Sequence, residues 1–284
     1  MFWANLTNCL LILRIDLKIK QSLRFRLSLA PECLAEVKRR RETLSNARAA
    51  REAQMLHAPG QHALPLPGAN VTYLVVVEMD KFHPNGQVIS RDRRRFLVNE
   101  FLAGDGTISA DLQALCVNPA LPLTPLVGVA MALSDSKSSV IEATAPAGQI
   151  FSFLPLPIEE RSASGLPVHV NGCFAISQNR RHLKWPSAGQ TVDGTDPSLL
   201  WNLCLLRDVV PLSYVALVLA ATRRPGVGAR RVHGALPNLM AVDEKWRCVL
   251  EPFYARLFEL PVFHSLLGGW RRCGGFMFYR RLVN

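Results

Sequence analysis

The stretch GLPVHVNGCFAISQNRR, residues 165–181, decides how the rest of the chain is interpreted. Asn171-Gly172 lies between two apolar runs, and this dipeptide is typical of a two-residue type I′ turn because both residues tolerate a positive φ. The sequence therefore predicts a β-hairpin that pairs Val170 with Cys173. Since both faces of this hairpin are mainly apolar, we expect it inside a covered sheet, with His169 as a packed core histidine rather than a catalytic base.

The predicted hairpin runs into a polar, doubly cationic end, Ser177 to Arg181. Guanidinium groups at the end of a rigid strand are suited to binding a carboxylate or a phosphate. The segment Ser177 to Arg181 could therefore bind an anion. On composition alone the alternative is favoured, namely an exposed strand end with ordinary surface ion pairs.

Several other segments predict a sheet. Apolar residues alternate with charged ones from Leu13 to Leu29, which indicates strands with one wet face, broken near Gln21-Ser22. Further strands are expected in β-branched runs separated by turn residues. These runs are 71–77, 96–102, 126–133 and 149–154.

A long helix without Gly or Pro is predicted from Glu32 to Met55. Its apolar stripe is thin, which is typical of a helix that protrudes from the fold. Helical patterns return after Trp185 in 199–206, 209–221, 241–250 and 252–260. The fold class is therefore α+β, a mixed sheet with a buried hairpin followed by a mostly helical segment. We expect a boundary near residue 190, which divides the chain into 1–190 and 191–284.

Composition limits the class of protein. The chain has 284 residues, of which 49% are hydrophobic, enough to bury a core. Its seven cysteines are widely spaced and form no CxxC pair, so we expect reduced thiols in a cytoplasmic protein without a metal site. The longest apolar run, Val209 to Ala221, is shorter than a bilayer requires, so no membrane association is expected.

The net charge of +11 leaves a second class of function open, a basic module that binds nucleic acid or an acidic protein partner. Two clusters are dense enough for this, 38–41 and 91–95. Neither is interleaved with aromatic residues, which weakens the nucleic-acid reading. Dispersed, solvated arginines are the simpler interpretation of most of the excess.

A family resemblance is carried by an ordered set of segments. Residues 151–158 (FSFLPLPI), 165–172 (GLPVHVNG), 174–177 (FAIS) and 179–181 (NRR) resemble the repeats of the sacsin family, very large chaperone-like proteins. The resemblance is strong for 150–215 and weaker elsewhere. It omits 31–70, which we interpret as an inserted helix and loop.

The resemblance implies a particular part of the repeat. In this family each repeat begins with an ATP-binding lobe similar to the ninety-kilodalton heat-shock chaperones, and this chain resembles the middle region that follows the lobe. Glu42 and Asn46 have the E-x-x-x-N spacing of the lobe, but no DxGxG turn follows them. We therefore expect no complete ATP site and no enzyme activity from the chain alone, and no cofactor unless a partner lobe supplies the pocket for ATP.

The resemblance also implies a role for the cationic end. In such split-site ATPases the middle region sends a cationic side chain to the γ-phosphate held in the other lobe, which places Arg180 and Arg181, with Asn179, at a composite nucleotide site. We expect a chaperone-associated module in protein folding and quality control, with chaperones, co-chaperones or client proteins as partners. Nucleic acid is not expected as a partner.

Overall fold

The computed structural model describes residues 9–11, 24–57, 66–83, 87–104, 106–133, 148–156, 164–186, 196–266 and 268–273. Within them the fold is α+β, as predicted. The strands are β1 (Cys9–Leu11), β2 (Arg24–Leu29), β3 (Ala69–Phe82), β4 (Val88–Leu102), β5 (Leu126–Leu133), β6 (Ile150–Ser152), β7 (Leu154–Pro155), β8 (His169–Gly172), β9 (Phe263–His264) and β10 (Trp270–Arg271). The helices are α1 (Leu34–His57), α2 (Ala110–Cys116), α3 (Pro197–Cys204), α4 (Val210–Arg223), α5 (Ala229–Gly234) and α6 (Leu250–Leu257), with 3-10 helices at Pro31–Cys33 and Glu244–Val249.

Eight strands form one sheet in the order β1-β2-β3-β4-β5-β8-β6-β7, and β9 and β10 form a separate pair. Within the large sheet every pairing is antiparallel except that of β6 with β8. The sequence predicted β5 at its observed bounds, whereas β3 and β4 extend further toward their connecting turn than the apolar runs indicated. Many of the extra residues are charged, and they carry the sheet beyond the core.

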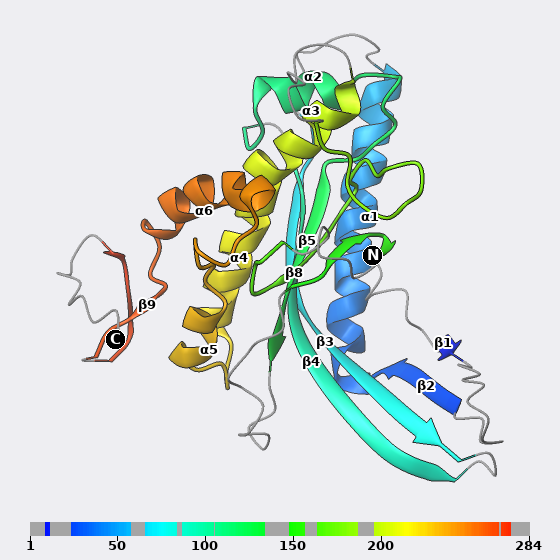
Figure 1. The fold of residues 1–284 in the computed structure, drawn as a ribbon, viewed down its shortest axis with the longest axis vertical. Coiled ribbons are helices and arrows are strands. Elements are labelled where there is room, and N and C mark those ends of the chain that lie inside the picture. The colour runs from blue at the N-terminus through cyan, green and yellow to red at the C-terminus, as the bar shows by residue number, and fades with distance from the viewer. Residues whose placement is uncertain are drawn as a thin grey trace.

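The two faces of the sheet are covered by different helices (Figure 1). Neighbouring residues of a strand point to opposite faces. Glu100 of β4 contacts α1 through Arg40, while Asn99 contacts α4, where the Ser213 hydroxyl donates to its side-chain oxygen at 2.9 Å. The sheet is therefore the middle layer, with α1 on one face and α4 on the other.

The expectation that the helix over 32–55 protrudes is wrong. Helix α1 packs against β3, and its residues Val37 and Leu44 are buried. Its apolar stripe is thin because Arg40 and Arg51 occupy inward positions on the same face and are also buried. Whether 31–70 is an insertion stays a prediction.

The prediction of a hairpin with its turn at Asn171-Gly172 is also wrong. Both residues lie inside β8, where Asn171 pairs with Gly128 of β5 and with Phe151 of β6. Strand pairing on both sides outweighs the local preference of this dipeptide for a turn. Gly172 is needed for another reason, since a Cβ there would lie 2.7 Å from the ring of Phe174.

The helical part begins with one long run from Pro197 to Arg223, in which a π-helical turn, Leu205–Val209, joins α3 to α4. Pro211 lacks the N–H that would bond to the carbonyl of Arg207, and the widened turn lies just before it. By length and composition this run of 27 residues is apolar enough to cross a membrane, so the argument from a short apolar run does not hold. Of its most apolar window, 61% is buried inside the protein.

The sequence-based division into 1–190 and 191–284 stays a prediction, because residues 187–195 lie outside the described part. In the residues that are described, a single apolar cluster extends from the sheet into the helical part and includes Val75, Val129, Trp201, Leu217 and Phe253. The sheet and α4 are therefore held by a common core.

Candidate functional site

The candidate residues Asn179, Arg180 and Arg181 lie together on a tight loop between Ile176 and Leu183, which pair as an isolated antiparallel bridge. The Ser177 backbone N–H donates to the His182 carbonyl at 2.9 Å, and the Arg180 N–H donates to the Ser177 carbonyl at 2.8 Å. The turn that the sequence placed at Asn171-Gly172 is therefore made one segment later, at the candidate site itself.

Asn179 organises the inside of this loop. Its side-chain oxygen accepts from the Ser177 hydroxyl at 2.6 Å and from the Arg181 backbone N–H at 3.2 Å. Arg180 has φ +55°, a left-handed conformation that costs a non-glycine residue energy and is retained only where the surroundings fix it. Asn179, Arg180 and Arg181 are all exposed. The loop thus presents two arginines at the surface from a backbone that its own hydrogen bonds hold.

The stem of the loop is anchored to α3 by the buried Asn202. Its amide nitrogen donates to the carbonyls of Ala175 and Lys184 at 2.8 and 2.9 Å, and its oxygen accepts from the Ala175 N–H at 2.8 Å. One side chain therefore bridges both strands of the stem. The sequence does not single out Asn202, because its role depends on residues that are distant along the chain.

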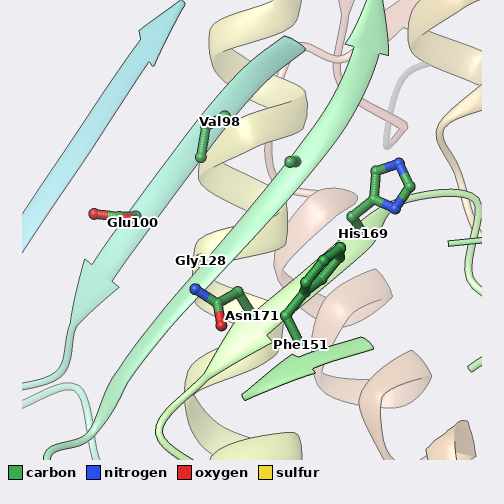
Figure 2. Close-up of a pocket in the computed structure, with 7 residues that line it drawn as sticks. Val98, Glu100, Gly128, Phe151, His169 and Asn171 are labelled. Atoms are coloured by element: carbon green, nitrogen blue, oxygen red, sulfur yellow. The ribbon is translucent and has the colours of Figure 1, made fainter. Parts of the chain in front are cut away.

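A small pocket lies on the face of the sheet that also carries α1, because Glu100, which lines it, contacts Arg40 of that helix. Figure 2 shows Val98 and Glu100 on β4, Gly128 on β5, His169 and Asn171 on β8, and Phe151 from β6 around it. Its volume of about 10 Å³ is far below that of sites for small organic ligands, which occupy about 300–1,000 Å³. A nucleotide therefore does not fit into this pocket.

His169 has a packing role, as predicted. Its Nδ1 accepts from the Gln149 N–H at 3.1 Å, and its ring lies edge-on to Phe96 and Phe151. Burial lowers the pKa of this imidazole, because the charged form loses solvation. A neutral histidine that accepts a backbone hydrogen bond has a structural role rather than a catalytic one.

The sequence did not reveal the buried ion pair between Arg40 and Glu100. Arg40 Nε donates to Glu100 Oε2 at 2.5 Å, and Nη2 contacts the same oxygen. The Arg40 guanidinium also lies 5.9 Å from the centre of the buried Tyr73 ring. Burial acts to raise the pKa of Glu100, but nearby positive charge, that of Arg40 included, outweighs it and holds the pKa below its usual value.

Lys38 and the E-x-x-x-N pair lie on the outer side of α1. Lys38 is paired with Glu42 at 4.0 Å on the exposed side of α1, and Asn46 is exposed as well. This pairing is an ordinary surface contact between residues one turn apart. The E-x-x-x-N spacing at Glu42 and Asn46 therefore lies on an exposed helix surface.

The second basic cluster, 91–95, lies on β4, and three of its four arginines face carboxylates. Arg91 forms a two-point pair with Asp80 at 2.6 and 3.2 Å, Arg93 contacts Glu32 and lies 3.7 Å from Glu78, and Arg94 lies 3.1 Å from Asp92. Such pairing reduces the charge that the cluster offers to a polyanion. Among the described residues, no group of three or more metal-ligating side chains is present.

Fold and site together define a sheet sandwiched between helices that presents a cationic loop next to α3. Comparison with known proteins finds a relative of this chain. Over 186 residues the chain is 34% identical to human sacsin, a match that covers 62% of this chain and 4% of sacsin. The chain thus contains a sacsin-like region and spans only a small part of the length of sacsin. No protein-family model matches the chain, and no solved structure does.

Proposed function

We propose that the chain acts as a chaperone-associated module in protein folding and quality control, and that its cationic loop contacts the phosphate of a nucleotide held by a separate ATP-binding lobe. The likeness to sacsin supports the first part. The observation that carries the second is the conformation of Arg180, whose positive φ is fixed by hydrogen bonds within an exposed loop.

The geometry of the loop supports a positioning function for the two arginines. Asn202 and the bridge between Ile176 and Leu183 fix the stem, so the guanidinium groups start from a defined backbone. A donor positioned in advance stabilises developing phosphate charge better than one that must be ordered during the reaction. In this proposal the chain supplies the cations, while the partner lobe supplies the pocket and the ATP.

The test is ATP hydrolysis by the full chain combined with the ATP-binding lobe of a sacsin repeat. Arg180→Ala or Arg181→Ala should lower turnover by about 10²- to 10³-fold if that side chain contacts the phosphate in the transition state. Arg256→Ala on α6, another exposed arginine, is the matched control and should leave turnover unchanged. Unchanged turnover in both loop variants would contradict the nucleotide contact.

The chaperone-associated role has its own test. The full chain, mixed with a protein that aggregates on heating, should reduce light scattering in proportion to its concentration. An unrelated basic protein of similar charge controls for nonspecific binding. If the chain and the control protein have the same effect, the likeness to sacsin does not extend to this activity.

A further inference from the structure

Strands β3 and β4 extend together beyond both helical layers and form an arm (Figure 1). We use this word for β2 together with residues 77–82 of β3 and residues 88–95 of β4. On one side the arm is completed by β2, which pairs with β3 from Leu29↔Val77 to Arg24↔Phe82. On the opposite side, formed by β4, no described strand pairs with residues 88–94 of the arm.

The outer edge of β4 lacks a neighbouring strand over residues 88–94. Its pairing with β5 begins only at Arg95↔Leu133 and continues toward Leu102, and within the described parts of the chain no other strand pairs there. Every residue from Val88 to Arg94 is exposed. An edge of this length matches a typical strand of about 5–6 residues, and among the described residues no strand takes up its peptide N–H and C=O groups.

The arm is strongly basic. In β2, residues 77–82 of β3 and residues 88–95 of β4, the cations outnumber the carboxylates, which are Glu78, Asp80 and Asp92. The cations are Arg24, Arg26, Lys81, Arg91, Arg93, Arg94 and Arg95. Arg94 has the most exposed side chain among the paired arginines of β4, at 70%. Because Arg91, Arg93 and Arg94 are each paired with a carboxylate, the net positive charge belongs to the arm as a whole and not to these three side chains.

This combination of free edge and charge selects among partners. Two basic edges repel each other, so the arm disfavours pairing with a second copy of this chain. Nucleic acid provides negative charge but no peptide groups for the edge, and residues 88–95 include no aromatic side chain on which bases stack. An extended peptide with carboxylates provides both.

We propose that β4 binds an extended acidic peptide segment of a partner protein by adding it to the sheet as a strand along Val88–Arg94. Backbone hydrogen bonds supply the register, and the net positive charge of the arm attracts carboxylates at alternate positions of the peptide. Val88 and Ile89, which are 47% and 39% exposed, offer apolar contact at the end of the edge. A segment that alternates acidic and β-branched residues has this chemistry.

The test uses the full chain and a fluorescent peptide of alternating Glu and Val, eight residues long. Its twin has the same sequence with N-methyl groups on alternate amides, which removes strand hydrogen bonds and leaves the charge unchanged. We expect the twin to bind at least about tenfold more weakly. Hydrogen exchange should show that alternate amides in Val88–Arg94 become protected only with the unmodified peptide.

A charge variant completes the experiment. Arg94→Glu should weaken binding about tenfold, since its only described partner is Asp92 on the same strand and the fold should tolerate the change. Arg256→Glu on α6 is the matched control and should bind as the parent does. Equal affinity of the two peptides, absence of edge protection, no binding of either peptide, or stronger binding of an oligothymidine than of the peptide would overturn the proposal.

Discussion

Nε of Arg40 in α1 lies 2.5 Å from Oε2 of Glu100 in β4, and both side chains are buried. The contact joins residues 60 positions apart and connects the helix of one layer to the central sheet. Arginine and glutamate usually lie at the surface, but here the two side chains neutralise each other in the interior. Several expectations about stability follow from it.

Removing one member of this pair should be costly. Glu100→Leu leaves the Arg40 charge buried without its carboxylate, and we expect a loss of about 3–5 kcal/mol in the free energy of unfolding. The double variant Arg40→Met with Glu100→Leu should recover most of that loss, because apolar side chains tolerate the site. Urea denaturation measures both. Glu42→Ala, which removes the exposed pair with Lys38, is the control and should change stability by less than about 1 kcal/mol.

Stability should fall in acid through Glu36 and Glu100. Burial acts to raise the pKa of Glu36. Hydrogen bonds from Arg224 and from the Leu74 N–H, together with the charge of Arg224, outweigh this effect. In the folded protein the pKa of Glu36 and the pKa of Glu100 are both lowered. Below the reference value of 4.5 the unfolded chain binds more protons, so the stabilisation is present above this pH and is lost as pH falls through the folded pKa.

Denaturation between pH 7 and pH 3 measures this dependence. Glu36→Gln should be less stable than the parent at pH 7 and should lose less on acidification. Exposed Glu251→Gln on α6 is the control and should follow the parent curve. A parallel curve for Glu36→Gln would contradict the assignment.

Gly165 should not tolerate a side chain. Its φ is +69°, and a Cβ would lie 1.9 Å from the carbonyl oxygen of Ala241. Gly226 has a similar φ of +81° with nothing within 4 Å, so it isolates the backbone contribution. We expect Gly226→Ala to cost about 1–2 kcal/mol and Gly165→Ala clearly more. Thermal unfolding of the two variants compares them, and equal losses would show that the contact with Ala241 is loose.

Cys173 should react slowly with alkylating reagents. Its thiol is buried, and burial raises its pKa to about 11, so the reactive thiolate is scarce at neutral pH. Peptide mapping after iodoacetamide treatment at pH 8 should find Cys173 far less modified than the half-buried Cys273, with the difference abolished in urea. Equal labelling in the native protein would show that the segment around β8 opens readily.

The strands of the sheet were largely predictable, and the helix that covers one face was not. Short apolar runs such as Leu126–Leu133, bounded by turn residues, favour a buried strand by their length and composition. In α1 the inward positions include Arg40 and Arg51, which by residue type read as surface. Arg40 is acceptable inside because Glu100 faces it, and the sequence does not show which carboxylate a distant helix will meet.

The candidate loop was found for a reason that proved partly wrong. The residue types of Asn179, Arg180 and Arg181 and their resemblance to the sacsin family indicated a cationic end, and the structure places all three on one exposed loop. The turn that precedes them was misplaced, because a local preference at Asn171-Gly172 yields to strand pairing with β5 and β6.

The sequence by itself determined the α+β class, the sheet strands with regular patterns and the cationic end at Arg180 and Arg181, since these depend on local periodicity and residue type. Only the tertiary structure decided the role of Asn171-Gly172, the burial of Arg40 and the edge of β4 that no described strand covers. Each of these depends on which distant segments become neighbours, and backbone hydrogen bonds and charge pairing between such neighbours outweigh local preference.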